Sequence, residues 1–189
     1  MKFCSTCGSA KLLTRIPDGD TVDRIVCSDC TTIHYQNPRI IVGCLPVWEE
    51  DGRVLLCKRA IEPRYGLWTL PAGFLENGET VEQGAMRETL EEANARVEMG
   101  DLYTMISLIH VHQVYMMYRA RLSDLDFGPG TESLEVELFG EDEIPWEQIA
   151  FKTITRTLRN YFLDRKQGSF RLHSSAIERG SRRPPDPHP

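Results

Sequence analysis

The feature that most constrains this chain is the segment 73–95, in which a glycine-containing loop leads into a stretch with helical spacing. Thr80 and Gln83 have the T-x-x-Q spacing of a capping box, so a helix is expected to begin after Thr80. Asn94 tolerates the left-handed conformation that often ends a helix. The sequence therefore predicts a loop followed by a helix that is capped at both ends.

Three glutamates, Glu88, Glu91 and Glu92, share one face of this predicted helix because they are spaced i, i+3, i+4. Like charges at this spacing destabilise an exposed helix by roughly 0.2–0.5 kcal/mol per pair. A hard divalent cation such as Mg²⁺ or Mn²⁺ reverses this repulsion, since it prefers carboxylate and carbonyl oxygens. A solvated acidic face is the alternative interpretation, but the glycines and the glutamate at fixed offsets before the helix favour metal binding.

Length and composition limit the classes of protein to which the chain can belong. Its 189 residues suit one domain plus a small module, and a hydrophobic fraction of 41% is sufficient for a core. The net charge of −6 argues against a general nucleic-acid or membrane-surface binder. No apolar run approaches the roughly 20 residues that span a bilayer, and no secretory signal begins the chain. Six cysteines without such a signal favour a reducing compartment, so we expect a cytoplasmic protein.

A second motif lies near the N-terminus, where two C-x2-C pairs are separated by 19 residues. The four residues are Cys4, Cys7, Cys27 and Cys30. This spacing is typical of a zinc ribbon, and the Zn²⁺ would be structural because four thiolates leave no position for water. Disulfides and an iron–sulfur site are the alternatives. Over residues 1–37, four basic residues balance four acidic ones, which favours packing or dimerisation over nucleic-acid binding.

The segment 73–95 resembles the Nudix box, whose pattern is G-x5-E-x7-R-E-U-x-E-E-x-G-U with U a bulky aliphatic residue. Three positions depart from this pattern, at Thr89, Asn94 and Ala95, and none of them removes a carboxylate. By this resemblance the chain is identified as a member of the Nudix hydrolases. The matching positions are Gly73, Glu79, Arg87, Glu88, Glu91 and Glu92.

The resemblance implies an α+β fold, the Nudix α/β/α sandwich with a mixed sheet, whereas the residue pattern alone supports a mixed α and β domain. The run 39–47 is nearly continuous in apolar residues and predicts a strand buried on both faces. We expect three parts: a small zinc ribbon over 1–37, a Nudix domain over 38–168, and a C-terminal tail over 169–189 that is largely disordered.

Two branches of zinc-ribbon Nudix enzymes differ in characteristic runs. NADH pyrophosphatases carry S-Q-P-W-P-F-P-x-S after the box, and nothing like it occurs between Arg96 and Leu122. The chain more closely resembles the FAD and ADP-ribose pyrophosphatases of plant type, for example in the run 66–73, G-L-W-T-L-P-A-G. The expected reaction is hydrolysis of the pyrophosphate bond of FAD or ADP-ribose to give AMP. NADH pyrophosphatase activity and a non-catalytic nucleotide sensor are the alternatives.

The resemblance also implies roles in catalysis. Glu88, Glu91 and Glu92 would hold Mg²⁺ or Mn²⁺ together with the backbone carbonyl of Ala72, and the metal would neutralise the diphosphate and lower the pKa of bound water. Glu132, in a later loop, is the candidate general base, although an ordinary surface position is the alternative for this residue.

Other box residues are expected to have structural roles. Arg87 and Glu79 would pair and hold the loop that contains Gly73 against the helix. Glu135 is held in reserve as a general base in case Glu132 does not reach the site.

Arg59 and Arg64 precede the box and are candidates to bind substrate phosphate, because arginine offers a planar fork of donors. Trp68 is a third candidate, since G-x-W-x-x-P is usual before a Nudix box. The alternatives are surface positions for the arginines and core packing for the tryptophan. The expected partner is a small-molecule nucleotide, with no nucleic acid and no membrane, and the resemblance implies a homodimer.

Overall fold

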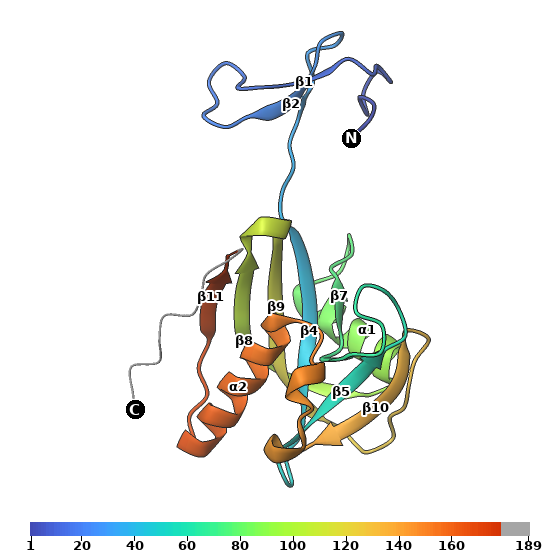
Figure 1. The fold of residues 1–189 in the computed structure, drawn as a ribbon, viewed down its shortest axis with the longest axis vertical. Coiled ribbons are helices and arrows are strands. Elements are labelled where there is room, and N and C mark those ends of the chain that lie inside the picture. Colours follow the sequence, from blue (N-terminus) through green and yellow to red (C-terminus); the bar gives the residue numbers. More distant parts are fainter. Residues whose placement is uncertain (179–189) are drawn as a thin grey trace. The chain divides into compact units, whose positions relative to one another are not determined.

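The structure is a computed structural model in which residues 1–178 are described. The chain divides into two units, Met1–Pro38 and a second unit that begins at Arg39, and Figure 1 shows the sheet of each. This division falls within one residue of the boundary expected from the sequence. In the described part of the chain, none of the helices is long and apolar enough to cross a membrane.

The first unit is a three-stranded antiparallel sheet with its cysteines gathered in one cluster. Its strands are β1 (Leu12–Arg15), β2 (Arg24–Cys27) and β3 (Ile33–His34). All four cysteine sulfurs lie within 4.8 Å of one another, and all four residues are free thiols. This is the arrangement of the predicted zinc ribbon, and it does not contain the alternative disulfides.

The second unit is built on a mixed sheet, with the strand order β10-β5-β4-β9-β8-β11 and with β6 paired to β5 and β7 paired to β4. Pairing is parallel between β4 and β9 and between β8 and β11, and antiparallel between the other neighbours. The elements are β4 (Arg39–Trp48), β5 (Arg53–Arg59), β6 (Trp68–Thr69), β7 (Ala72–Phe74), α1 (Val81–Ala93), β8 (Val97–Leu108), η1 (Ile109–Val111), β9 (Gln113–Leu122), β10 (Ser133–Phe139), η2 (Glu141–Glu143), η3 (Trp146–Gln148), α2 (Lys152–Gln167) and β11 (His173–Ile177).

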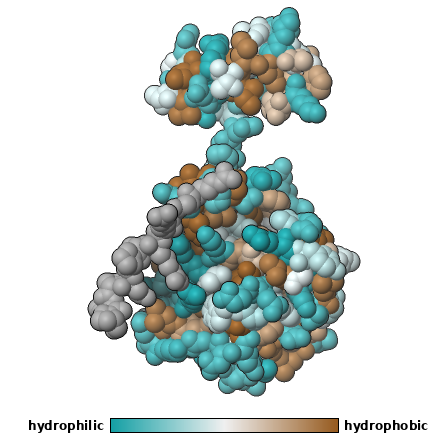
Figure 2. Space-filling view, in the orientation of Figure 1, coloured by the Kyte–Doolittle hydropathy of each residue, from teal (hydrophilic) through white to brown (hydrophobic). Residues whose placement is uncertain are grey.

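Strand β4 is buried on both faces, as its apolar run predicts. Ile41 and Leu45 share a cluster with Ile154 of α2, whereas Val42 shares another with Ala85 of α1. Because successive side chains of a strand point to opposite faces, the two helices cover opposite faces of the sheet (Figure 1). The predicted α/β/α sandwich is therefore confirmed. Figure 2 shows mainly hydrophilic residues, with smaller hydrophobic groups, on the face of this unit that it presents.

Helix α1 begins and ends at the predicted residues. The Thr80 hydroxyl accepts a hydrogen bond from the amide of Gln83 at 3.2 Å, and the Gln83 side chain accepts one from the amide of Thr80 at 2.8 Å. Asn94 adopts the left-handed conformation with φ of 48°, and its amide donates to the carbonyl of Leu90. These caps define both ends of the helix and thereby position its carboxylates.

The C-terminal part of the described chain differs from the prediction. A largely disordered tail is expected from residue 169, but His173–Ile177 form strand β11, which pairs in parallel with β8. Arg156 of α2 holds this strand by donating to the hydroxyl of Ser175 at 2.9 Å and to the carbonyl of Ala176 at 3.2 Å. These partners are distant in sequence, so local composition does not reveal the strand. Residues 179–189 of the predicted tail lie outside the described residues.

Candidate active site

A cavity of about 740 Å³ lies in the second unit and is lined by residues of α1, β7, the start of β9 and the loops after β5 and before β10. Its volume falls within the range of ligand-binding cavities, roughly 300–1,000 Å³. The cavity lining contains two arginines, Arg59 and Arg87, and six glutamates, so acidic side chains outnumber basic ones. An anionic ligand would be repelled here unless cations accompanied it. The acidic lining residues are Glu62, Glu76, Glu88, Glu91, Glu92 and Glu132.

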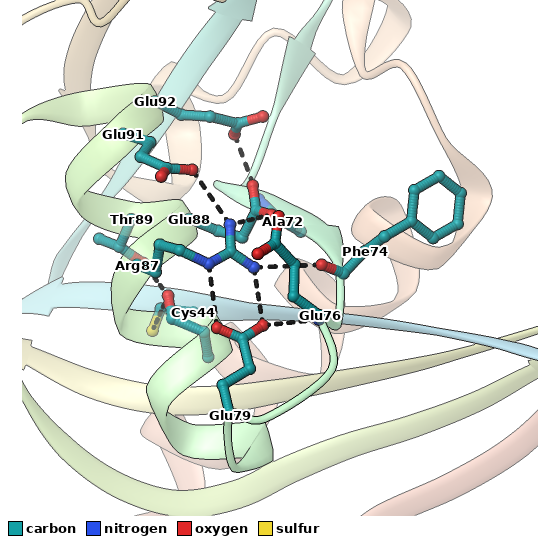
Figure 3. A network of polar contacts seen from close by, with 11 residues as sticks. Cys44, Ala72, Phe74, Glu76, Glu79, Arg87, Glu88, Thr89, Glu91 and Glu92 are labelled. Atoms are coloured by element: carbon teal, nitrogen blue, oxygen red, sulfur yellow. Dashed lines mark hydrogen bonds and ion pairs between the residues drawn. The ribbon is translucent and has the colours of Figure 1, made fainter.

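Two carboxylates of α1 approach the backbone of β7, which precedes the helix (Figure 3). The amide of Ala72 donates to Oε2 of Glu92 at 3.2 Å. Glu88 lies so close to Gly73 that a Cβ atom at position 73 would overlap its carboxylate. A larger residue at this position would therefore displace the carboxylate of a cavity-lining glutamate.

Arg87 joins the loop and the helix through several ion pairs (Figure 3). Its Nη2 and Nε donate to Glu79 at 2.8 and 3.0 Å, and Nη2 also donates to the carbonyl of Phe74 at 3.1 Å. Hydrogen bonding from Arg87 lowers the pKa of Glu79 to about 2. The sequence leads us to expect this pair, but not the further bonds from Nη1 to Glu88 at 2.7 Å and to Glu91 at 3.0 Å.

Glu92 is a carboxylate in surroundings that oppose its charge. It is 6% exposed, and among residues 1–178 it takes part in no ion pair. Burial is the main cause that raises its pKa to about 8, and Glu88 and Glu132 add to the rise, whereas the amide of Ala72 acts in the opposite direction. The pKa of Glu88 is also raised, chiefly by burial. A nearby cation would favour the charged forms of both groups.

The oxygen donors of this site suit a hard divalent cation such as Mg²⁺ or Mn²⁺. In the described chain, the cysteines of the ribbon are the one set of three or more candidate ligands whose donor atoms lie within 4.8 Å of one another. The box carboxylates are less closely gathered because Arg87 holds Glu88 and Glu91. A cation at this site would therefore compete with Arg87 for these two side chains.

Comparison with known families agrees with this geometry. The sequence matches the NUDIX domain over residues 37–158 and the zinc-ribbon family described as Nudix N-terminal over residues 2–36. The chain belongs to the Nudix family. A NUDIX hydrolase from Nitrosomonas europaea, known from a crystal structure, is 60% identical and has a TM-score of 0.88, with 94% of this chain and 99% of that chain covered.

Two curated relatives are both named "NAD-capped RNA hydrolase NudC". That of Vibrio atlanticus is 37% identical over 51% of this chain and 33% of its own length. That of Photobacterium profundum is 30% identical over 82% of this chain and 56% of its own length. This chain thus spans between a third and just over half of the curated relatives that it matches.

The loop before β10 brings Glu132 to the wall of the Nudix cavity. The amides of Gly128 and Gly130 donate to carbonyls in the last turn of α1 at 2.9 and 3.0 Å. The side chain of Asn94 donates to the carbonyl of Pro129 at 3.1 Å. Capping of the helix and placement of the candidate base therefore depend on the same short loop.

The structure places the predicted substrate-binding residues in different surroundings. Arg59 lines the cavity and is 9% exposed. Arg64 is exposed and lies outside the lining, and Trp68 is 6% exposed within the apolar core. Neither Arg64 nor Trp68 is among the residues that line the cavity, so a substrate-binding role for either stays a prediction, and the burial of Trp68 agrees with the alternative of core packing. The reserve base Glu135 also lies outside the lining and pairs with Lys58 at 2.8 Å.

Several lining residues are missed by sequence reasoning. Gln113 and Tyr115 lie at the start of β9, two positions apart and therefore on the same face of the strand. Phe74 directly follows the first glycine of the box, and Phe151 precedes α2. The alternation of polar and aromatic residues at the start of an apolar strand was the sequence signal for these lining positions. The sequence does not show which strands become neighbours, and this decides which residues line the cavity.

Proposed function

We propose that this Nudix hydrolase cleaves the pyrophosphate bond of an NAD-type dinucleotide in the presence of Mg²⁺ or Mn²⁺, giving AMP and a nicotinamide mononucleotide. The observation that carries the proposal is the group of box carboxylates on one wall of the cavity, where Glu92 is buried without an ion pair among residues 1–178. The names of the curated relatives support an NAD-type substrate over FAD or ADP-ribose.

Different residues of the cavity would have different roles in the proposed reaction. Glu88, Glu91 and Glu92, with the backbone of Ala72, would hold the divalent cation, which supplies charge neutralisation and a more acidic water. Glu132 would accept the proton of the attacking water, since it lines the same cavity. Water forms a bond to one phosphorus, and the bond from that phosphorus to the bridging oxygen breaks, leaving its electron pair on the other phosphate.

Arg87 and Glu79 have an orienting role in this proposal. Their paired side chains connect the loop before α1 with the helix. Arg87 also bonds to Glu88 and Glu91, so it controls the direction in which these carboxylates face.

The nicotinamide end of the substrate would be recognised without the S-Q-P-W-P-F-P-x-S run. In this chain the segment between Arg96 and Leu122 forms β8, η1 and β9, and it contributes Gln113 and Tyr115 to the cavity. FAD and ADP-ribose share the adenosine diphosphate part of NAD and are therefore the competing substrates. A homodimer is also proposed, and light scattering during size-exclusion chromatography would test it.

The test is a product assay with NADH, an NAD-capped RNA oligonucleotide, FAD and ADP-ribose, each with Mg²⁺ or Mn²⁺. We expect AMP and nicotinamide mononucleotide from NADH, and a loss of at least about 100-fold in kcat for Glu92→Gln. Glu137→Gln is the matched control, because this exposed carboxylate lies outside the cavity lining.

Each outcome of the assay has a distinct meaning. Preference for FAD or ADP-ribose would leave the chemistry in place and replace the substrate. Preference for the capped RNA over free NADH would extend the substrate to nucleic acid. If the protein binds a dinucleotide but does not cleave it with either Mg²⁺ or Mn²⁺ present, the result would support the sensor alternative instead.

A further inference from the structure

Arg59 is a buried cation that forms no ion pair in the described chain, although its charge acts on the nearby carboxylate of Glu92. Within residues 1–178 its side chain forms one hydrogen bond, from Nε to the carbonyl of Pro63 at 2.9 Å, and no ion pair. Its Cζ lies 5.3 Å from the ring centroid of Phe151. These contacts orient the guanidinium, and they leave its two Nη groups without an anionic partner beside the cavity that the residue lines.

An arginine in this state requires an explanation, because a buried charge is costly unless it is paired and hydrogen-bonded. The other arginine of the cavity, Arg87, is already engaged with Glu79, Glu88 and Glu91. A phosphate group matches the planar fork of a guanidinium and would satisfy its remaining donors. The remaining charged residues of the lining are carboxylates, which repel a phosphate and therefore cannot bind it directly.

Tyr115 is a second hydrogen-bond donor in the lining of the same cavity. It is 9% exposed, lines the cavity, and forms no side-chain hydrogen bond within the described residues. Burial raises the pKa of its hydroxyl, while the charge of Arg59 acts in the opposite direction. The hydroxyl therefore stays protonated at neutral pH and can donate to an anion near Arg59.

We propose that Arg59 and Tyr115 form a subsite for the phosphate that water does not attack, the one that leaves with the bridging oxygen. The assignment rests on the proposed pyrophosphatase function and adds that different residues of the cavity bind the two phosphates. In this proposal the box carboxylates, with a cation that they would hold, serve the attacked phosphate, and the donors on β5 and β9 serve the departing one. When the bond to the bridging oxygen breaks, the electron pair passes to this second phosphate, and Arg59 and Tyr115 stabilise the added charge.

The test measures binding of α,β-methylene-ADP, a pyrophosphate analogue with a carbon bridge, by calorimetry in the presence of Mg²⁺. Arg59→Gln is expected to weaken binding by about 10- to 100-fold and Tyr115→Phe by about 3- to 10-fold. Arg59→Lys keeps the charge without the fork and should fall between wild type and Arg59→Gln. The matched controls are Arg53→Gln and Tyr65→Phe, which alter residues outside the cavity lining.

Kinetics separate this role from simple binding. Because charge develops on the departing phosphate, kcat for dinucleotide cleavage should fall in the Arg59 and Tyr115 variants along with affinity. Thermal unfolding of each variant shows whether it folds, and Tyr115→Phe keeps the ring that packs in the core.

Two results would overturn different statements. Analogue affinity and kcat that match wild type in folded Arg59→Gln and Tyr115→Phe would refute the subsite and leave the pyrophosphatase function standing. Wild-type protein that neither binds the analogue nor cleaves any dinucleotide would refute the proposed function, and the subsite with it.

Discussion

Single residues of the Nudix box meet different physical requirements. Gly73 leaves room for the carboxylate of Glu88, which occupies the space that a Cβ atom would take. In the proposed reaction Glu92 acts through its charge, although burial disfavours that charge in the absence of a cation. A bound cation would relieve this unfavourable burial of charge, so the box carboxylates are expected to affect stability as well as activity.

At the residue scale we predict that Glu92→Gln raises the thermal stability of metal-free protein at alkaline pH. The folded-state pKa of Glu92 is about 8, above the ordinary value of 4.5, so the folded state binds a proton that the unfolded state releases. The gain should be absent below about pH 4.5, grow as the pH rises, and be complete above about pH 8. Thermal unfolding in EDTA at pH 5, 7 and 9 measures it.

The control for this experiment is Glu137→Gln, because Glu137 is an exposed strand residue outside the cavity. It should change the unfolding temperature little at any pH. A Glu92→Gln effect of equal size at pH 5 and pH 9 would contradict the assigned electrostatic cause.

At the scale of elements, the loop before β10 and the end of α1 act as one assembly. Gly130 approaches α1 so closely that a Cβ atom would overlap the carbonyl of Glu91, whereas a Cβ atom at Gly128 would meet open space. The same loop carries Glu132 into the cavity. Displacement of the loop should therefore impair both stability and hydrolysis.

We predict that Gly130→Ala lowers the free energy of unfolding by about 1–3 kcal/mol, as overpacking does, and lowers kcat about tenfold or more by moving the proposed base. Gly128→Ala is the matched control and should behave nearly as wild type. Urea unfolding and dinucleotide hydrolysis measure the two effects. Equal behaviour of the two variants would show that the close approach of Gly130 is not required.

A second set of contacts at this scale joins α2 to β8 and β11. Asp164 is buried, and its Oδ2 accepts from the hydroxyl of Tyr103 at 2.9 Å and pairs with Nε2 of His173 at 2.7 Å. Burial acts to raise the pKa of Asp164, but these two partners outweigh it and the net pKa is lowered. The stabilisation is present above the unfolded pKa of 3.8 and is lost as the pH falls through the folded value.

We predict that Asp164→Asn lowers the free energy of unfolding at pH 7 by about 1.5–3 kcal/mol, the usual contribution of hydrogen bonds to a charged group. The difference from wild type should shrink in acid, where both proteins carry a neutral side chain at this position. Urea unfolding at pH 7 and at successively lower pH below 3.8 follows the change. Asp142→Asn, at an exposed position, should have little effect, and a comparable loss there would contradict the assignment.

At the scale of the whole molecule, the six cysteines belong to two separate environments. Four form the cluster of the ribbon, and the other two, Cys44 and Cys57, are buried in the sheet of the Nudix unit. Burial raises the pKa of both thiols, which makes them poor nucleophiles. The ribbon has little core of its own, so Zn²⁺ is expected to supply much of its stability.

We predict one Zn²⁺ per chain by elemental analysis and four reactive thiols after chelation under native conditions. Cys44 and Cys57 should react with a thiol reagent only when the Nudix unit unfolds. Replacement of Cys7 by serine should abolish stoichiometric zinc binding. Reaction of all six thiols with the reagent, in protein that retains its native circular dichroism, would contradict this separation of environments.

The sequence by itself determined the features that depend on spacing along the chain. The capping residues Thr80 and Asn94, the carboxylate face of α1 and the cysteine pairs of the ribbon follow from periods and motifs of a few residues, because helices and metal knuckles are local structures. The double burial of β4 follows from its apolar composition. These features carry the fold class and the chemistry of one wall of the cavity.

The tertiary structure alone decided which side chains complete that wall. It placed Arg59 at the cavity and Trp68 in the core, and it brought Tyr115 and Glu132 into the lining of the cavity that the carboxylates of α1 also line. It also formed β11 from residues that the sequence assigns to a tail. The physical reason is that these positions depend on the pairing of strands and loops distant in sequence, and such pairing is selected by packing of the whole unit rather than by local preference.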